Sequence, residues 1–189
     1  MFNKTFFSFH NIIMALKKGE IIAYPTEAVF GLGCDPDNEE AIHKLFLLKQ
    51  RSWKKGFILI ASSYEQLIPY IDDQKLTMKQ KKIIFSMKKK PITWVLPAKK
   101  NISKWLTGTF NSIAVRIINF QLIKDLCFFY GKPLISTSAN LHGEPPCKTK
   151  EEVILKFNDQ VFILDGVVGG HKNPSEIRDI ITGCLYRKN

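Results

Sequence analysis

Residues 24–33 of this sequence (YPTEAVFGLG) combine hydroxyl and carboxylate side chains with two glycines. An apolar run stops there, and Thr26 and Glu27 then lead to Gly31 and Gly33. Proteins built from helices on a sheet bind ligands at loops beyond strand ends, and glycine lets the backbone approach a ligand closely. The segment is therefore a candidate binding loop, although two glycines without a third also fit a plain tight turn.

A second candidate segment is basic. Lys49, Arg51 and Lys55 precede the apolar run 57–61 within the sequence KQRSWKKG. Arginine binds a phosphate through a fork of N–H donors and lysine binds it as a point charge. The three side chains are thus able to converge on a phosphate chain, and a solvated basic loop is the alternative.

Small polar side chains follow two later apolar runs. Ser136, Ser138 and Asn140 lie in the sequence STSAN, and Ser175 lies in the sequence NPSEIRD, with Arg187 further on. Such neutral donors and acceptors bind a carboxylate, an amine or a ribose, although they also fit turns and caps. A serine nucleophile is not expected, because no Gly-x-Ser-x-Gly turn surrounds these serines.

Apolar runs alternate with amphipathic stretches along the whole chain. We expect helices at 9–18, 37–48, 63–71, 76–88, 120–130 and 149–157. We expect strands at 20–24, 57–61, 92–97, 113–118, 133–136, 161–164, 177–181 and 184–187. This interleaving predicts an α/β fold with helices packed on a twisted sheet, which is mixed because the late strands follow one another closely. No linker or repeat interrupts it, so we expect a single domain over residues 1–189.

Composition excludes several classes of protein. The chain has 189 residues, 45% hydrophobic and 24% charged, which is typical of a globular domain. No apolar run is long enough for a transmembrane helix, and the N-terminus lacks a signal-peptide pattern, so we expect a cytoplasmic protein without membrane contact. The four cysteines and four histidines have no metal-site spacing. The net charge of +11 indicates a polyanionic partner.

The order of these segments, with Ser112–Arg116 (SIAVR) between them, resembles the threonylcarbamoyl-AMP synthase family of the TsaC/YrdC type, in its single-domain bacterial form. The resemblance covers nearly the whole chain. It implies a twisted mixed sheet with a basic concave face (the YrdC-like fold). It also implies a nucleotidyltransferase that converts L-threonine, bicarbonate and ATP into threonylcarbamoyl-adenylate and pyrophosphate. That product serves t6A modification at position 37 of tRNAs that read codons starting with A.

The resemblance implies a role for each site residue. Lys49 and Arg51 are the implied catalytic residues. The residues implied for threonine are Thr26, Arg116, Ser136 and Ser175. Those implied for ATP are Lys49, Arg51, Lys55, Ser112, Ser138, Asn140 and Arg187. Mg²⁺ is expected with ATP and not on cysteine or histidine ligands, tRNA is an expected partner of the basic face, and the t6A transferase proteins are expected downstream.

The sequence departs from the family pattern in three segments. Ser52 stands where the family often has proline, and Lys88, Lys89 and Lys90 replace an aromatic-Pro-Gly stretch. Ile60 stands where some relatives use a histidine to contact threonine. These departures predict a more mobile basic loop and a histidine contact with threonine that is missing or replaced.

Two other functions remain open on sequence. The lysine clusters suit a module that binds structured RNA, but this does not explain hydroxyls and glycines at strand ends. A domain that makes a carbamoyl-adenylate from carbamoyl phosphate, as in hydrogenase maturation proteins, normally accompanies zinc-finger-like cysteine motifs that this sequence lacks.

Overall fold

Nine strands form one mixed sheet in the computed structural model, which describes residues 9–86 and 91–188. Along the sheet the order is β7-β1-β2-β6-β3-β5-β4-β8-β9. The strands are β1 (Ile22–Pro25), β2 (Phe30–Gly33), β3 (Ile58–Ala61), β4 (Ile92–Pro97), β5 (Ser112–Ile117), β6 (Leu134–Ser138), β7 (Phe162–Ile163), β8 (Glu176–Asp179) and β9 (Leu185–Arg187). The pairs β1–β7, β3–β5 and β4–β8 are parallel and the other pairs are antiparallel. The expected mixed α/β sheet is therefore confirmed.

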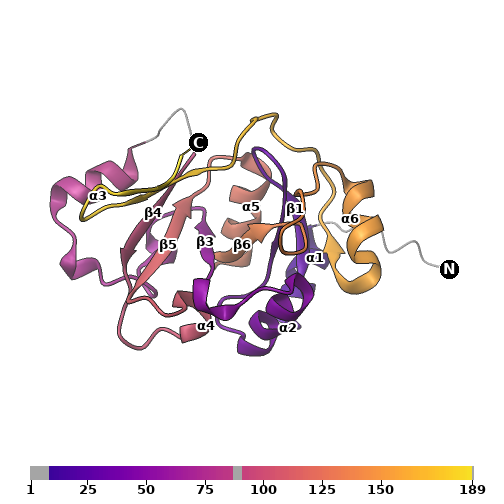
Figure 1. The fold of residues 1–189 in the computed structure, drawn as a ribbon, viewed down its shortest axis with the longest axis horizontal. Coiled ribbons are helices and arrows are strands. Elements are labelled where there is room, and N and C mark those ends of the chain that lie inside the picture. Colours follow the sequence, from indigo (N-terminus) through magenta and orange to yellow (C-terminus); the bar gives the residue numbers. More distant parts are fainter. Residues whose placement is uncertain (1–8, 87–90, 189) are drawn as a thin grey trace.

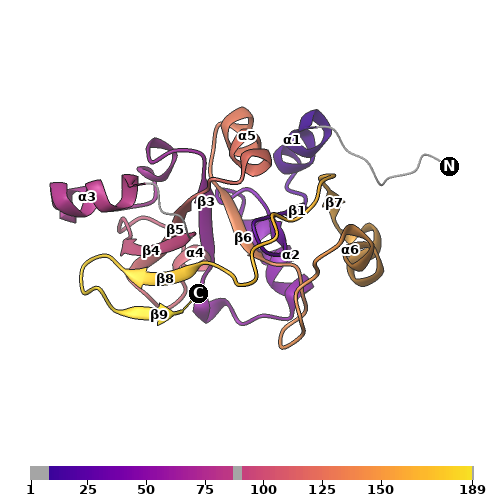
Figure 2. The same cartoon turned by 90° about the horizontal axis from the view of Figure 1, so that it is seen from above.

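Helices lie on both sides of this sheet (Figures 1 and 2). They are α1 (Phe9–Lys17), α2 (Glu39–Lys49), α3 (Met78–Phe85), α4 (Lys104–Thr107), α5 (Gln121–Tyr130) and α6 (Lys150–Phe157). Helices α1 and α5 pack side by side, and their buried residues join one apolar cluster with strand residues such as Ile60 and Leu134. The buried apolar residues of α2 belong to a second, larger cluster.

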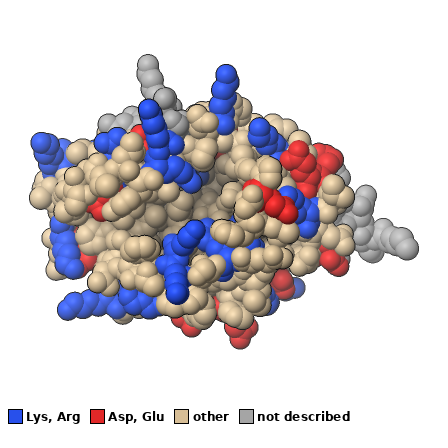
Figure 3. Space-filling view, viewed as in Figure 1, with Lys and Arg blue, Asp and Glu red and all other residues tan. Residues whose placement is uncertain are grey.

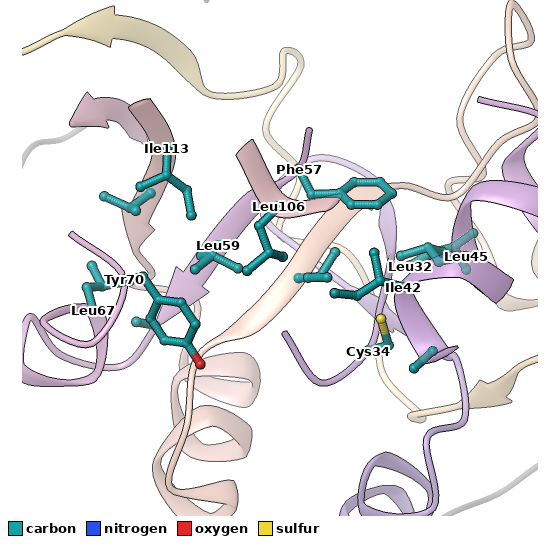
Figure 4. Packing of buried hydrophobic residues seen from close by; sticks show 14 of the residues in the cluster. Leu32, Cys34, Ile42, Leu45, Phe57, Leu59, Leu67, Tyr70, Leu106 and Ile113 are labelled. Carbon is teal, nitrogen blue, oxygen red and sulfur yellow. The ribbon is translucent and has the colours of Figure 1, made fainter. Parts of the chain in front are cut away.

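Side chains alternate between the two faces along each central strand. Leu59 of β3 and Ile113 of β5 belong to the larger cluster, where Leu59 lies beside Leu106 (Figure 4). Ala114 lies between the cluster residues Ile113 and Val115 of β5, so it faces the opposite side of the sheet. Helix α5 covers one end of that side, and the other end is the floor of a cavity described below.

Strand β2 was not expected, because its sequence FGLG has two glycines and follows a candidate binding loop. The structure pairs it antiparallel with β1 and with β6. Gly33 explains the missing signal: a Cβ atom there would lie 2.1 Å from the carbonyl oxygen of Ile135. The strand needs glycine because the neighbouring strand packs closely against it. A prediction from residue propensities disfavours a strand where glycine occurs.

Two expected helices differ from the structure. The helix expected at 63–71 is only a 3-10 turn, Glu65–Leu67, because Pro69 cannot continue a helix. The helix expected at 76–88 is Met78–Phe85, capped by Thr77; residues 87–90, with the lysines that depart from the family pattern, lie outside the described residues. No helix in the part that the structure describes is long and apolar enough to cross a membrane.

We expect Gly33→Ala to destabilise the fold by about 2–3 kcal/mol, because the added methyl group must displace the β6 backbone. The matched control is Gly143→Ala, where an added Cβ atom meets nothing within 4 Å and only the backbone angle of +86° is unfavourable. That control should cost about 1 kcal/mol. Urea denaturation of both variants checks the difference, and equal costs would contradict the close packing of β2 on β6.

Candidate active site

A cavity of about 450 Å³ lies on the open part of the sheet. Its walls come from the turn between β1 and β2, from β3, β4, β5 and β6, from the basic segment after α2 and from the C-terminal strands β8 and β9. In Figure 1 the C-terminal segment (yellow) runs from α6 across to these last two strands. Figure 3 shows the hollow in this face with Lys and Arg side chains around it.

The structure brings most of the predicted site residues into this one cavity. Its lining includes Thr26, Arg51, Lys55, Ser112, Arg116, Ser136, Ser138, Ser175 and Arg187. The strand register explains part of this gathering, because Ile58 of β3 pairs with Ala114 on one side and with Ser136 on the other. Polar residues of β5 and β6 therefore flank β3 on the same face of the sheet.

Arg51 is fixed at the cavity wall by its own neighbours. Its Nη2 donates to the carbonyl oxygen of Gly56 at 2.8 Å, and its Nη1 donates to the hydroxyl of Thr137 at 3.3 Å. The guanidinium lies 5.1 Å from the ring centroid of Phe57, and burial lowers its pKa. Since arginine keeps its charge in proteins, Arg51 is a pre-positioned cation for an anionic ligand.

Lys49 and Asn140 are not among the residues that line the cavity. The Lys49 ammonium donates to the carbonyl oxygens of Ser138 and Asn140, at 2.5 and 2.8 Å, and to the Asn140 side chain at 3.2 Å. Burial, and then the neighbouring charge of Arg51, lower the pKa of Lys49 to about 8. In this structure the lysine holds the end of β6, where the cavity residue Ser138 lies, together with the loop that follows, and it does not itself line the cavity.

Two residues that line the cavity, Glu27 and Arg116, form a buried ion pair. The Arg116 Nη1 atom is 3.4 Å from Oε2 of Glu27, and both side chains are about nine-tenths buried. Arg116 is on β5, and Glu27 is in the turn between β1 and β2. The longer separation leaves the pair without hydrogen bonds between these atoms, so each partner keeps bonding capacity for a ligand.

A hydroxyl network joins the C-terminal strands to the sheet. The Ser175 hydroxyl lies 2.7 Å from that of Thr93 on β4. Arg187 donates to both the carbonyl and hydroxyl oxygens of Ser175, at 2.9 and 3.1 Å. Burial, and then the nearby positive charge of Arg116, lower the pKa of Arg187. The cavity thus contains several cations whose mutual repulsion favours an anionic ligand.

Sequence reasoning gave no role to several residues of the cavity. Glu27 was noted only as a carboxylate in a candidate loop and Thr137 only as a hydroxyl of the sequence STSAN, while Thr93, Phe110 and Tyr186 were not noted. Thr93 is a polar residue within an apolar strand, ITWVLP, and this pattern was an available signal. In the structure its side chain is fully buried. The exposed aromatic residues of the rim carry no sequence signal, because single surface aromatics are common.

Ile60 does not line the cavity, although it pairs with Arg116 across the two strands. Its side chain belongs to the apolar cluster with Tyr24 and Ile118. Ile58, on the same face of β3, does line the cavity. The position at which some relatives carry a histidine is therefore part of the core in this chain.

The arrangement suits charge neutralisation and alignment. The lining has several cations, one carboxylate and many hydroxyls, and contains no histidine or cysteine among the described residues. Phosphoryl transfer depends on positioning and on stabilisation of negative charge, and it needs little covalent chemistry from the protein. The cavity can hold a phosphate-bearing ligand and a second, zwitterionic ligand together.

Comparison with known proteins gives a consistent result. The family model Sua5/YciO/YrdC, described as "Telomere recombination", matches residues 14–188. A threonylcarbamoyl-AMP synthase of Photorhabdus laumondii is 58% identical over 188 residues, covering 100% of both chains. A threonylcarbamoyl-AMP synthase of Yersinia enterocolitica is 55% identical over 178 residues, covering 94% of both.

Solved structures share the fold. The structure of P. abyssi Sua5 complexed with L-threonine matches with a TM-score of 0.83 at 25% identity, over 90% of this chain. This chain spans about half of that protein (50%). A match over most of the chain at high identity is strong evidence of common descent, and the chain belongs to the Sua5/YciO/YrdC family.

Proposed function

We propose that this chain is a threonylcarbamoyl-AMP synthase, which converts L-threonine, bicarbonate and ATP into threonylcarbamoyl-adenylate and pyrophosphate. One observation carries the proposal: a single cavity brings together Arg51 and Lys55, suited to phosphates, with Arg116, Ser136 and hydroxyls suited to an amino acid. The relatives that match over their full length have this name. The product supplies t6A modification of tRNAs that read codons starting with A.

The reaction has two parts. The ammonium group of threonine first loses a proton; the resulting amine then adds to the carbon of bicarbonate, and loss of water leaves a carbamate. A carbamate oxygen then attacks the α-phosphorus of ATP, and the bond to the β-phosphate oxygen breaks to release pyrophosphate. This makes the chain a nucleotidyltransferase by reaction type, and the main demands on the protein are alignment and neutralisation of charge.

Each predicted site residue that lines the cavity has a role in this scheme. Arg51 and Lys55 bind the phosphates and stabilise the charge that develops on the leaving pyrophosphate. Thr26, Arg116, Ser136 and Ser175 bind threonine, with the Arg116 guanidinium on its carboxylate. Ser112, Ser138 and Arg187 surround the remainder of the nucleotide. Mg²⁺ enters as the complex with ATP, with phosphate and water oxygens as its ligands.

Lys49 and Asn140 act on the nucleotide indirectly in this proposal. The Lys49 ammonium donates hydrogen bonds to three oxygens, the backbone oxygens of Ser138 and Asn140 and the side-chain oxygen of Asn140. These bonds fix the segment that places Ser138 in the cavity. Lys49 is a positioning residue that also adds positive charge beside Arg51.

Several partners follow from the reaction and from the charge of the chain. A net charge of +11 supports contact with tRNA through the basic face. The t6A transferase proteins would use the product downstream, and the site of action would be the cytoplasm, where ATP and tRNA are available.

Pyrophosphate release tests the proposed function directly. We expect release from Mg²⁺-ATP only when both L-threonine and bicarbonate are present, with serine and valine as poorer substitutes. Carbamoyl phosphate in place of threonine and bicarbonate should give no release. Release with carbamoyl phosphate alone, or no release from folded protein, would overturn the proposal; tight salt-dependent tRNA binding in the second case would favour an RNA-binding module.

The Arg51→Ala variant should lower kcat/KM for ATP at least about 100-fold, because a fixed cation is removed from the phosphate site. Arg51→Lys should recover part of the loss, since it keeps the charge without the fork. The matched control is Arg178→Ala: Arg178 pairs with Glu176 and is not among the residues lining the cavity. Wild-type rates in Arg51→Ala would refute the role of this arginine.

The lowered pKa of Lys49 predicts a pH dependence. Above about pH 8 the free enzyme loses this proton, and the neutral amine no longer holds all three oxygens or adds charge beside Arg51. We expect kcat/KM for ATP, which reports groups of the free enzyme, to fall as pH rises through about 8.

Lys49→Arg should move this fall to higher pH, because arginine stays protonated. The control is Lys44→Arg on the exposed side of α2, which should leave the fall near pH 8. An unchanged fall in Lys49→Arg would show that another group titrates.

A further inference from the structure

Three buried side-chain atoms have no hydrogen-bond partner among the described residues. They are Glu27 Oε2, Arg51 Nε and Arg116 Nε. All three belong to residues that line the cavity. Because buried polar atoms are nearly always hydrogen-bonded in folded proteins, unsatisfied atoms on a cavity wall indicate where a polar ligand bonds.

Glu27 is the one acidic residue in the described lining of this cavity. Only 9% of the residue is exposed, so its carboxylate cannot be satisfied by bulk water alone. Its Oε2 lies 3.4 Å from Arg116 Nη1, which balances its charge without a hydrogen bond. An acidic side chain in a cavity rich in cations does not serve a phosphate, which it would repel.

The backbone holds Glu27 firmly in place. The carbonyl oxygen of Glu27 accepts a hydrogen bond from the His171 backbone N–H at 2.8 Å, and that of Thr26 accepts one from Gly169 at 2.9 Å. A Cβ atom on Gly169 would lie 3.1 Å from the Glu27 Cα atom, so the two segments pack without space between them. The backbone that carries this carboxylate is therefore fixed in the cavity wall.

We infer that Glu27 binds the α-ammonium group of the amino-acid substrate while Arg116 binds its carboxylate. This assignment rests on the proposed function for its substrate class. An amino acid is a zwitterion, and the Glu27–Arg116 pair offers one negative and one positive group on the same wall. The zwitterion brings no net charge into the cavity, and its two charged ends supply the hydrogen bonds that both side chains lack.

The assignment has a consequence for specificity. The family resemblance leaves the amine to hydroxyl groups, which accept equally from an alcohol or a neutral amine. A carboxylate instead selects a cation, so the site rejects hydroxy acids that lack the amino group. A bound hydroxy acid would leave the buried Glu27 carboxylate without a hydrogen-bond partner. The cost of that unpaired charge makes the discrimination against hydroxy acids strong.

Equilibrium binding of two ligands tests the assignment. L-threonine and 3-hydroxybutyrate share the carboxylate and the β-hydroxyl group and differ in the amino group. Wild-type protein should bind threonine at least tenfold more tightly than 3-hydroxybutyrate. Glu27→Gln should weaken threonine binding at least tenfold and leave 3-hydroxybutyrate binding within about twofold.

The controls separate a binding role from a structural one. Glu151→Gln removes the same charge from an exposed position of α6 and should change neither ligand. If Glu27→Gln weakens both ligands equally, Glu27 only orients Arg116 and the assignment is overturned. Unchanged threonine binding in Glu27→Gln would overturn it as well.

The wild-type protein alone also decides the question if Glu27→Gln does not fold. Equal wild-type affinity for threonine and 3-hydroxybutyrate overturns the assignment, even if pyrophosphate release requires threonine and bicarbonate. Wild-type protein that neither binds threonine nor releases pyrophosphate overturns the proposed function, and this assignment with it. The two failures are thus distinguishable.

Discussion

Alternation of side chains across the central strands is the constraint on which this structure depends. Each residue step along β3, β5 or β6 turns the next side chain to the other face. One face is apolar and packs into the larger cluster, so charged residues are confined to the other. Helix α5 covers only part of that second face. The uncovered part carries Arg116 and Ser136 on the two strands that flank β3, and a cavity with polar walls results.

The strand ends supply what the strands alone do not. Arg51, Thr26 and Ser175 come from three loops that are far apart in the sequence, and the register of the sheet brings them to one cavity. Hydrogen bonds donated to backbone carbonyl oxygens fix the side chains of Thr26, Arg51 and Arg187 before any ligand arrives. Such preorganisation lowers the cost of orienting substrate, which is the main contribution of protein to this type of chemistry.

Much of this arrangement is predictable from sequence. The apolar runs at 57–61 and 113–118 predict buried strands, and polar residues directly after such runs predict a site at strand ends. Strand β2 is not predictable in this way, because its glycines are required by contacts with Ile135 and Tyr24 that only the folded sheet reveals. The position of Lys49 is also inaccessible: its type and spacing suggest a phosphate ligand, whereas its partners are backbone oxygens about ninety positions away. Glu27 is visible in the sequence, but its pairing with Arg116 depends on the register of β5.

The hairpin of β8 and β9 is at the edge of the sheet, and none of its strand residues is fully buried. Edge strands with solvated hydrogen bonds open locally at a smaller free-energy cost than central strands. The wall that carries Tyr186 and Arg187 is therefore the part of the cavity that opens most readily, while Arg116 and Ser136 stay fixed on central strands. A bulky adenylate thus has an exit at this edge, where Arg187 and its partner Ser175 give way together while Arg116 and Ser136 keep their places for the next turnover.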